Sequence, residues 1–236
     1  MTTSTDKSAF WAGLRDGLSF SFVVVPFATL FGVVALDAGL TLAQTIGFTV
    51  LVIAGAAQFA AVQLMLDNAA IGFVLLAALA VNLRMAMYSA ALVPYLGSAP
   101  LWQRALVSYL NFDQSYVASI AKYEAEPDLP VSARVAYFLG VSSAIAPLWI
   151  AASIVGALIG KAIPDALALD FILPIAFLSL VAPMLRTLAH VAAALVSIVV
   201  SLLLIGLPSG SGLLIAAFCA MVAGVLVETW MERKAA

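Results

Sequence analysis

The chain has 236 residues, of which 65% are hydrophobic and only 9% are charged, and its mean hydropathy is +1.16. A soluble globular domain is about 45–50% apolar and about 25% charged, so this chain has too little polar surface to cover itself in water. The formal net charge of −2 and the pI of about 5.2 give no support to nucleic-acid binding. The composition predicts an integral membrane protein with the lipid bilayer as its solvent.

Two long segments, residues 38–66 and 187–227, contain no Asp, Glu, Lys or Arg. A helix needs roughly 20 apolar residues to cross the hydrocarbon core, so the first fits one crossing and the second fits two, separated by GLPSGSG at 206–212. Long apolar runs lack the alternation of a barrel strand, which leaves helices. We predict an all-α, polytopic helical bundle, a single transmembrane transporter domain over residues 1–236 with a cytoplasmic N-terminal segment at 1–17. The expected spans, about eight, are residues 18–36, 43–66, 70–95, 104–122, 133–159, 170–185, 188–206 and 212–230.

The basic residues predict the topology, because cytoplasmic loops are enriched in Lys and Arg. The polar segment 104–122 is the least regular of the expected spans, and without it the count is seven and the N-terminus lies outside. Eight spans place more basic residues in the cytoplasm, with both termini there, and this is the arrangement we expect. The cytoplasmic side would hold Lys7, Arg15, Lys122, Arg134, Arg186, Arg233 and Lys234, and the outer side Arg104 and Lys161.

Pro26 and Pro147 each remove a backbone donor inside an apolar segment. We expect Pro-broken helices, whose freed backbone groups bind substrates near the midplane of many transporters, although a tolerated kink is the alternative. The surrounding sequences, VVVPFATLFG and SAIAPLWIAASIVG, resemble each other. This likeness indicates an internal repeat unless it arises by chance. GALIG at 156–160 has the small-residue spacing of a helix-packing face.

Arg84 and Asp113 lie in the middle of two consecutive expected spans. Ionisable side chains at membrane depth cost about 2.5–3.5 kcal/mol on insertion scales and are functional candidates by default. A pair between the two would offset much of their desolvation. Two interpretations are open. In the first, the pair serves only to hold the third and fourth helices together. In the second, Arg84 or Asp113 contacts the substrate or a coupling ion. We favour the second interpretation.

Several amides accompany these charges. Gln58 follows the small residues of AGAAQF, and Asn82 precedes Arg84 by two residues. Asn111, Gln114 and Ser115 are spaced to form one helix face. A single amide in lipid more often joins helices than binds a ligand, but several near one depth favour a polar cavity.

Catalysis is not expected. The chain has one histidine, His190, and one cysteine, Cys219, and it lacks metalloprotease, phosphate-loop and Cys/His metal motifs. His190 follows Arg186 by four residues and is best interpreted as interfacial. The sequence therefore predicts no enzyme, no cofactor and no metal site.

Three motifs occur in a specific order and spacing. They are G-x8-P-F-A-x-x-F-G from Gly17 to Gly32, AGAAQFAA from Ala54 to Ala61, and NLRMAMYSAALVPYL from Asn82 to Leu96. Together they resemble the AzlC family, the large subunits of branched-chain amino acid exporters, and the resemblance extends over about residues 10–206. It implies a multi-pass protein of the bacterial inner membrane, a small AzlD-type partner subunit and export driven by the proton motive force.

The chain departs from the family pattern at two places. Met85 follows Arg84 where the family usually has histidine, and Phe112 and Gln114 flank Asp113 where it usually has T-D-E. If the missing histidine or glutamate carries protons elsewhere in the family, Asp113 is the remaining proton-coupling candidate.

The leading hypothesis is a secondary transporter that exports branched-chain or other apolar amino acids, with Arg84 binding the substrate carboxylate. Apolar residues of the first, second and fifth helices would receive the substrate side chain. The alternatives are a non-transporting membrane scaffold, in which Arg84 and Asp113 touch only each other, and a transporter of another small solute. The expected substrate-binding residues are Pro26, Gln58, Asn82, Arg84, Asn111 and Gln114.

Overall fold

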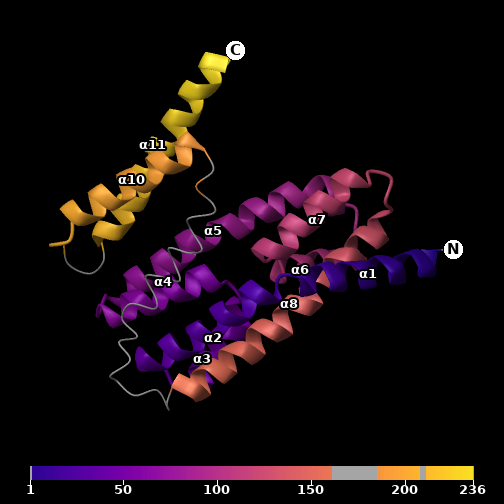
Figure 1. Ribbon diagram of the computed structural model, residues 1–236, viewed down its shortest axis with the longest axis horizontal. Coiled ribbons are helices and arrows are strands. Elements are labelled where there is room, and N and C mark those ends of the chain that lie inside the picture. The colour runs from indigo at the N-terminus through magenta and orange to yellow at the C-terminus, as the bar shows by residue number, and fades with distance from the viewer. Residues whose placement is uncertain (1, 161–184, 186, 208–210, 236) are drawn as a thin grey trace. The chain divides into compact units, whose positions relative to one another are not determined.

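The computed structural model describes residues 2–160, 185, 187–207 and 211–235. The described part of the chain is helical and contains no strand, which confirms the all-α prediction (Figure 1). Its helices are α1 (Thr2–Leu18), α2 (Ser21–Asp37), α3 (Leu42–Val52), α4 (Gly55–Leu66), α5 (Ile71–Leu96), α6 (Leu101–Tyr109), α7 (Asp113–Ala125), α8 (Val131–Gly160), α10 (Leu188–Leu203) and α11 (Ser211–Ala235).

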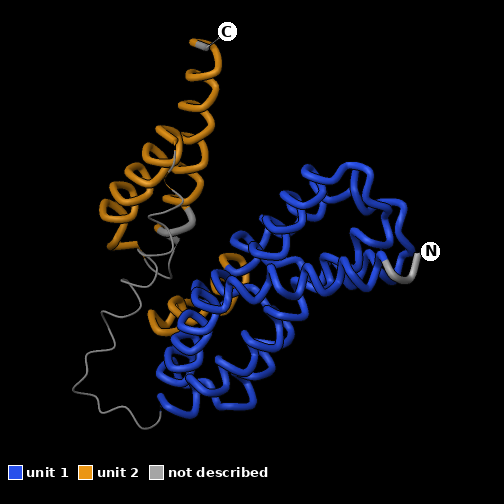
Figure 2. Tube along the Cα trace, turned by 45° about the vertical axis from the view of Figure 1, so that its right-hand side comes forward, with its two compact units in different colours: residues 1–60, 78–163 blue, residues 61–77, 164–236 orange. Residues whose placement is uncertain are grey.

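The chain forms two compact units (Figure 2). The first contains residues 1–60 and 78–163, and the second contains residues 61–77 and 164–236. The candidate site residues all belong to the first unit.

The core of the first unit is the packing of α8 against α1 and α2 through glycine. A Cβ atom at Gly13 of α1 would clash with the carbonyl oxygen of Tyr137, and one at Gly32 of α2 with that of Ser153. In the opposite direction, Gly156 of α8 lies against the backbone of Thr29. Small residues let helix backbones approach this closely, and in lipid such contacts drive helix association. The prediction that 156–160 is a packing face is confirmed.

These contacts also fix the relative direction of the helices. Gly17 of α1 lies against Val141, and Gly160 at the end of α8 lies against Val33 near the end of α2. Residue numbers rise together on both sides, so α8 runs parallel to α1 and α2. If both cross the membrane, the chain between them crosses an odd number of times.

The helices are not interrupted at the prolines. α2 continues through Pro26 and α8 continues through Pro147, so the expected breaks at these residues are not observed. Membrane helices accommodate a proline when neighbouring groups satisfy the freed carbonyl. The interruptions lie instead at residues 19–20, 53–54 and 110–112, so the expected spans 43–66 and 104–122 are each two shorter helices.

Three described helical segments are long and apolar enough to cross a membrane: α5, α8 and residues 215–234 of α11. A fourth is added if α1 and α2, which are bent by 61°, form one span. The interrupted pairs α3–α4 and α6–α7 have shorter helices, and about eight crossings therefore remain a prediction. The expected span 170–185 lies outside the described residues except for Leu185.

The second unit contains the hairpin of α10 and α11. Gly212 packs on Leu204. A Cβ atom added at Gly224 would lie 3.5 Å from the Cβ atom of Ala193. In these two contacts the residue numbers rise along α11 as they fall along α10, so the two helices are antiparallel. At the end of α11, the Lys234 ammonium lies 4.1 Å from the ring centre of Trp230.

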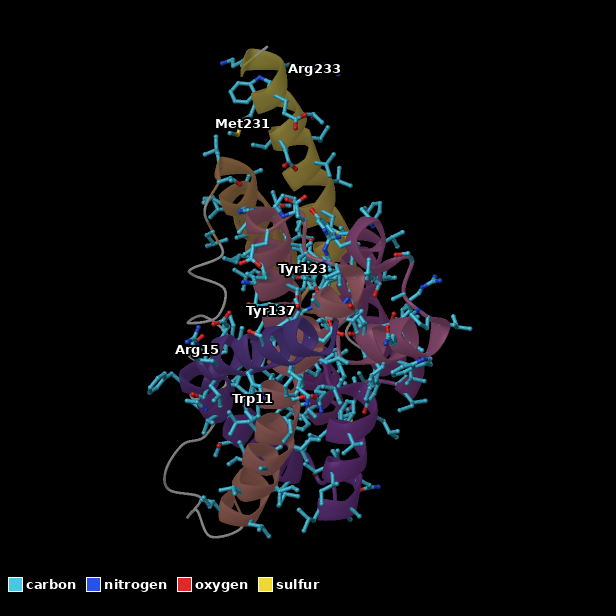
Figure 3. The ribbon with its side chains drawn as sticks, turned by 90° about the vertical axis from the view of Figure 1, so that its right-hand side faces the viewer. Trp11, Arg15, Tyr123, Tyr137, Met231 and Arg233 are labelled. Atoms are coloured by element: carbon cyan, nitrogen blue, oxygen red, sulfur yellow. The ribbon has the colours of Figure 1, made fainter. Side chains whose placement is uncertain are left out.

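One end of α7 is tied to α5 and α8. The Tyr123 hydroxyl donates a hydrogen bond of 2.8 Å to the carbonyl of Arg134, and the Arg134 guanidinium donates to the carbonyls of Tyr95 and Pro127. Lys122 lies 5.7 Å from the ring centre of Tyr137, and Figure 3 shows Tyr123 and Tyr137 in the same region. These contacts hold the end of α7 in place and thereby position its beginning, where the candidate site lies.

Candidate functional site

Arg84 of α5 and Asp113 of α7 form an ion pair. Nη1 of Arg84 lies 3.0 Å from Oδ2 of Asp113, and the side chains are 28% and 40% exposed. Nε of Arg84 and Oδ1 of Asp113 are buried and have no hydrogen-bond partner in the described part of the chain. The pair is therefore incompletely satisfied, with one free donor and one free acceptor.

Asp113 stands at the first position of α7, after the interruption at 110–112. The residue before α7, Phe112, has no polar side chain that could cap the helix. Its backbone N–H instead donates a hydrogen bond of 2.8 Å to the hydroxyl of Ser115. The carbonyl of Leu110 lies 3.0 Å from the Ser115 hydroxyl and 3.2 Å from that of Ser142 in α8. A carboxylate at a helix N-terminus is stabilised by the helix dipole. The interruption thus places the Asp113 carboxylate in the first turn of α7.

Asn111 lies inside this interruption and is 3% exposed. Its Nδ2 donates 3.2 Å to the hydroxyl of Ser89 in α5, and its Oδ1 has no partner among the described residues. Because α7 begins only at Asp113, Asn111 does not share a helix face with Gln114 and Ser115 as we expected from their spacing. It reaches the site from the irregular backbone instead.

Two tyrosines lie next to the ion pair. The rings of Tyr88 in α5 and Tyr116 in α7 stack with their centres 4.2 Å apart and their planes 9° apart. The Tyr88 hydroxyl approaches the carboxylate of Asp113. Tyr88 is one turn from Arg84, so the stack and the ion pair clamp α5 to α7 over a single turn of each.

The interruption between α3 and α4 contains Ile53 in a left-handed conformation, with φ at 35°. This conformation is uncommon for a β-branched residue and costs about 1–3 kcal/mol. Gly55 follows, and a Cβ there would lie 2.7 Å from the ring of Trp149 in α8. The break therefore combines backbone strain with close packing.

Gln58 lies one turn beyond this break and is fully buried, with 0% exposure. Neither atom of its amide has a hydrogen-bond partner in the described part of the chain. The same is true of the hydroxyls of Thr49 and Ser153 and of Nε1 of Trp149. Buried polar groups in folded proteins are normally paired, so a cluster of exceptions in one region requires an explanation.

Aromatic rings surround Gln58 and the α3–α4 break. The ring of Phe27 lies 4.7 Å from that of Phe59 and 6.0 Å from that of Trp149, measured between centres. Phe31 lies 5.5 Å from Phe59 and 6.3 Å from Trp149. We call Phe27, Phe31, Phe59 and Trp149 the aromatic cluster. It combines residues of the first, second and fifth expected helices, where an apolar substrate side chain was expected.

The remaining expected site residues differ in how deeply they are buried. Asn82 is half-buried and its Oδ1 has no partner among the described residues, and Gln114 is half-buried in the first turn of α7. Pro26 is exposed on α2. No described hydrogen bond, ion pair or ring contact joins Pro26 or Gln58 to the Arg84–Asp113 pair.

Sequence reasoning missed the residues that connect these parts. Ser89 and Ser142 bind the α6–α7 interruption, Trp149 belongs to the aromatic cluster, and the hydroxyl of Tyr109 donates 2.5 Å to the carbonyl of Val50. For Ser89 the sequence did contain a signal: it is a polar residue one turn after Met85, on the apolar helix that carries Arg84. No local pattern identifies Tyr109, whose partner lies in another helix.

The atoms without partners in this region include both donors and acceptors. A guanidinium N–H is available for a carboxylate, and the free oxygens of Asp113 and Asn111 are available for an ammonium. Among the described residues, no group of three or more His, Cys, Asp or Glu could hold a metal ion.

The family model described as AzlC protein matches residues 19–163, more than half of the chain. The chain belongs to the AzlC family. This family is associated with branched-chain amino acid transport rather than with an enzymatic activity. The matched region contains the Arg84–Asp113 pair, both interruptions and the aromatic cluster, but neither α10 nor α11. No curated protein and no solved structure matches the chain.

Proposed function

We propose that this AzlC-family protein is the large subunit of a secondary transporter that exports branched-chain or other apolar amino acids. It would act in the bacterial inner membrane with a small AzlD-type subunit and both termini in the cytoplasm. The observation that carries the proposal is the incompletely satisfied ion pair of Arg84 and Asp113 at a helix interruption. A scaffold that only joins helices needs no free donor and acceptor at this position.

The parallel packing of α8 with α1 and α2 supports eight crossings. It requires an odd number of crossings between them, which α3–α4, α5 and α6–α7 would provide. With α10, α11 and the expected span 170–185 added, the total is about eight. Discontinuous helices such as α3–α4 and α6–α7 form substrate sites in many transporter folds.

In the proposed site, Arg84 binds the substrate carboxylate through its free Nε donor, and Oδ1 of Asp113 and Oδ1 of Asn111 accept from the ammonium. Guanidinium–carboxylate bonds are among the strongest hydrogen bonds in proteins. The aromatic cluster would receive the apolar side chain in a conformation that connects the two interruptions. Discrimination among leucine, isoleucine and valine then depends on a methyl group or two, worth about 1–3 kcal/mol.

The proposed binding mode implies a direction for proton coupling. Ionised Asp113 attracts the substrate ammonium. Protonated Asp113 loses this attraction, and its carboxyl O–H then faces the N–H groups of the ammonium, which are also hydrogen-bond donors. A proton and a substrate therefore compete for the same carboxylate. Competition of this kind gives antiport, in which an entering proton drives an amino acid out.

The test is efflux of labelled leucine from cells that express this chain with its small-subunit neighbour. We expect efflux by the wild type, and loss of efflux in Asp113→Asn at equal expression, since the amide neither attracts the ammonium nor carries a proton. Equal efflux by both proteins would remove Asp113 from the transport site. No efflux of any apolar amino acid by the wild type would reject the proposed function.

A further inference from the structure

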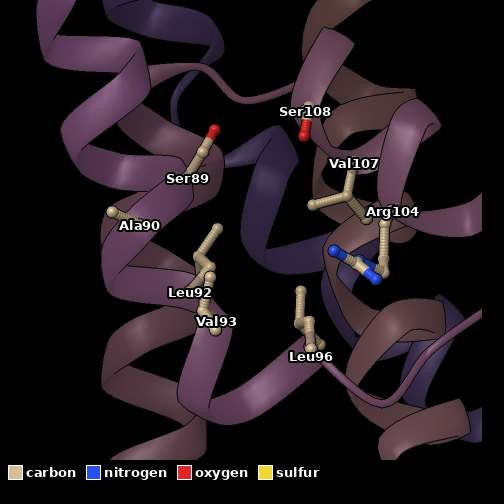
Figure 4. A pocket seen from close by; sticks show the side chains of 9 residues that line it. Ser89, Ala90, Leu92, Val93, Leu96, Arg104, Val107 and Ser108 are labelled. Carbon is tan, nitrogen blue, oxygen red and sulfur yellow. The ribbon is translucent and has the colours of Figure 1, made fainter. Parts of the chain in front are cut away.

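A cavity lies between the C-terminal half of α5 and α6 (Figure 4). Its volume is about 250 Å³, below the range of about 300–1,000 Å³ typical of pockets for drug-sized ligands. Leu92, Val93 and Leu96 of α5 form one wall, and Val107 of α6 lies opposite. The size and the apolar walls restrict the occupant to a small molecule with an apolar part.

Arg104 of α6 supplies a positive charge to this cavity. Its guanidinium is directed from α6 into the space beside α5 (Figure 4). Arg104 forms no ion pair with a carboxylate in the described part of the chain, in contrast to Arg84. An unpaired guanidinium beside an apolar wall is a suitable partner for a carboxylate whose remaining atoms are apolar.

Two hydroxyl groups complete the lining. Ser89 projects from α5 and Ser108 from α6 into the same end of the cavity (Figure 4). A hydroxyl oxygen can accept a hydrogen bond from an ammonium. The cavity thus offers a cation, two acceptors and an apolar wall, which match the three chemical parts of an apolar α-amino acid.

The cavity is connected to the site described above. Ser89 accepts the hydrogen bond of 3.2 Å from Asn111, whose other amide atom faces no partner at the α6–α7 interruption. Ser89 therefore belongs to the cavity lining and is hydrogen-bonded to the residue two positions before Asp113. In the expected topology Arg104 lies on the outer side of the membrane.

We propose that this cavity is a second, outer binding site for the transported amino acid, occupied after the Arg84–Asp113 site and before release. Arg104 binds the carboxylate, Ser89 and Ser108 accept from the ammonium, and Leu92, Val93, Leu96 and Val107 contact the side chain. This inference rests on the proposed function, but apart from Ser89 it assigns residues that the transport site itself does not use.

The experiment measures how fast a charged thiosulfonate reagent labels a single cysteine. Ser108→Cys places the thiol in the cavity, keeps a weak acceptor at this position and leaves Ser89 as the main acceptor for the ammonium. Leu101→Cys, an exposed position on α6 outside the lining, is the matched control. Both variants carry Cys219→Ala. The full chain is reconstituted with its small subunit in vesicles of zwitterionic phospholipid, and labelling is followed with leucine, with leucinol or with neither.

We expect leucine to slow labelling at residue 108 and not at residue 101, and leucinol, which lacks the carboxylate, to have no effect. Arg104→Gln should weaken protection by leucine about tenfold or more, the loss expected when a charge-assisted hydrogen bond is removed. Protection that persists unchanged in Arg104→Gln would show an indirect conformational effect and overturn the inference.

Two further outcomes separate this inference from the proposed function. Leucine efflux by Ser108→Cys without protection of the thiol would overturn the second site and leave the transporter standing, whereas absence of efflux and of protection would overturn both. If anionic phospholipid slows labelling at residue 108 and leucine does not, the cavity holds a lipid phosphate, and the inference is wrong.

Discussion

The hydroxyl of Tyr109, at the end of α6, donates a hydrogen bond of 2.5 Å to the carbonyl of Val50 in the last turn of α3. The last four carbonyls of a helix have no partner within it, so this bond satisfies a group that the α3–α4 interruption leaves free. The two residues are 59 positions apart in the sequence. The bond therefore connects the two interruptions that flank the expected substrate path.

Tyr109→Phe should destabilise the protein by about 1–3 kcal/mol, because it leaves the carbonyl of Val50 without a donor. Thermal unfolding in detergent measures the change, and Trp102→Phe, an exposed position on α6, should stay within about 0.5 kcal/mol of the wild type. Equal stability of the two variants would show that water or lipid satisfies Val50 equally well. Leucine efflux should fall in Tyr109→Phe, since the interruptions lose their connection.

Gln58→Met should raise the stability of the protein by about 1–3 kcal/mol, since it removes a buried amide without a partner and keeps the side-chain length. The same variant should lower leucine efflux, because the amide would remain unpaired in the folded state only where a ligand or a second conformation uses it. The two readouts together separate function from folding.

The control is Gln63→Met on the exposed face of the same helix, where stability should change by less than about 0.5 kcal/mol. Destabilisation by Gln58→Met would mean that the amide has a partner in the membrane-embedded protein. Higher stability with unchanged efflux would exclude Gln58 from the transport path.

Composition was sufficient to predict the helical membrane fold, and two opposite charges in consecutive apolar segments were sufficient to predict the Arg84–Asp113 pair. Both predictions follow from the same physical rule: unpaired polar groups in lipid are energetically unfavourable, whatever the sequence. The interruptions were placed incorrectly because Pro26 and Pro147 look like helix breakers, whereas Ile53 does not. The break at Ile53 is maintained by tertiary packing around Gly55 and Trp149, and no local pattern encodes that packing.

The amides illustrate the same limit. The spacing of Asn111 and Gln114 predicted one helix face, but the cap provided by Ser115 starts α7 at Asp113 and removes Asn111 from the helix. Periodicity assumes a continuous helix, so it fails where a side chain competes for the backbone. The choice of these polar residues as site residues stays a prediction, whereas the expected helix face shared by Asn111 and Gln114 was wrong.

A double-mutant cycle on Arg84 and Asp113 separates transport from scaffolding. The side chains are partly exposed, so the coupling energy for stability between Arg84→Gln and Asp113→Asn should be about 1 kcal/mol or less. Efflux should be lost in both single variants and in the double variant, because each group binds a different part of the substrate. Wild-type efflux in the double variant would show that the pair only joins α5 to α7.

Gly156→Ala should destabilise the protein by about 1–3 kcal/mol, because the new Cβ meets the backbone of Thr29 and forces α2 away from α8. Gly47→Ala in α3 is the matched control: a Cβ there meets nothing within 4 Å, and alanine in a helix should stabilise by about 0.5–1 kcal/mol. Opposite signs in thermal unfolding would establish that the glycines of α8 are required for close packing. A stabilising Gly156→Ala would contradict the parallel α2–α8 contact, and with it the argument for an odd number of crossings between these helices.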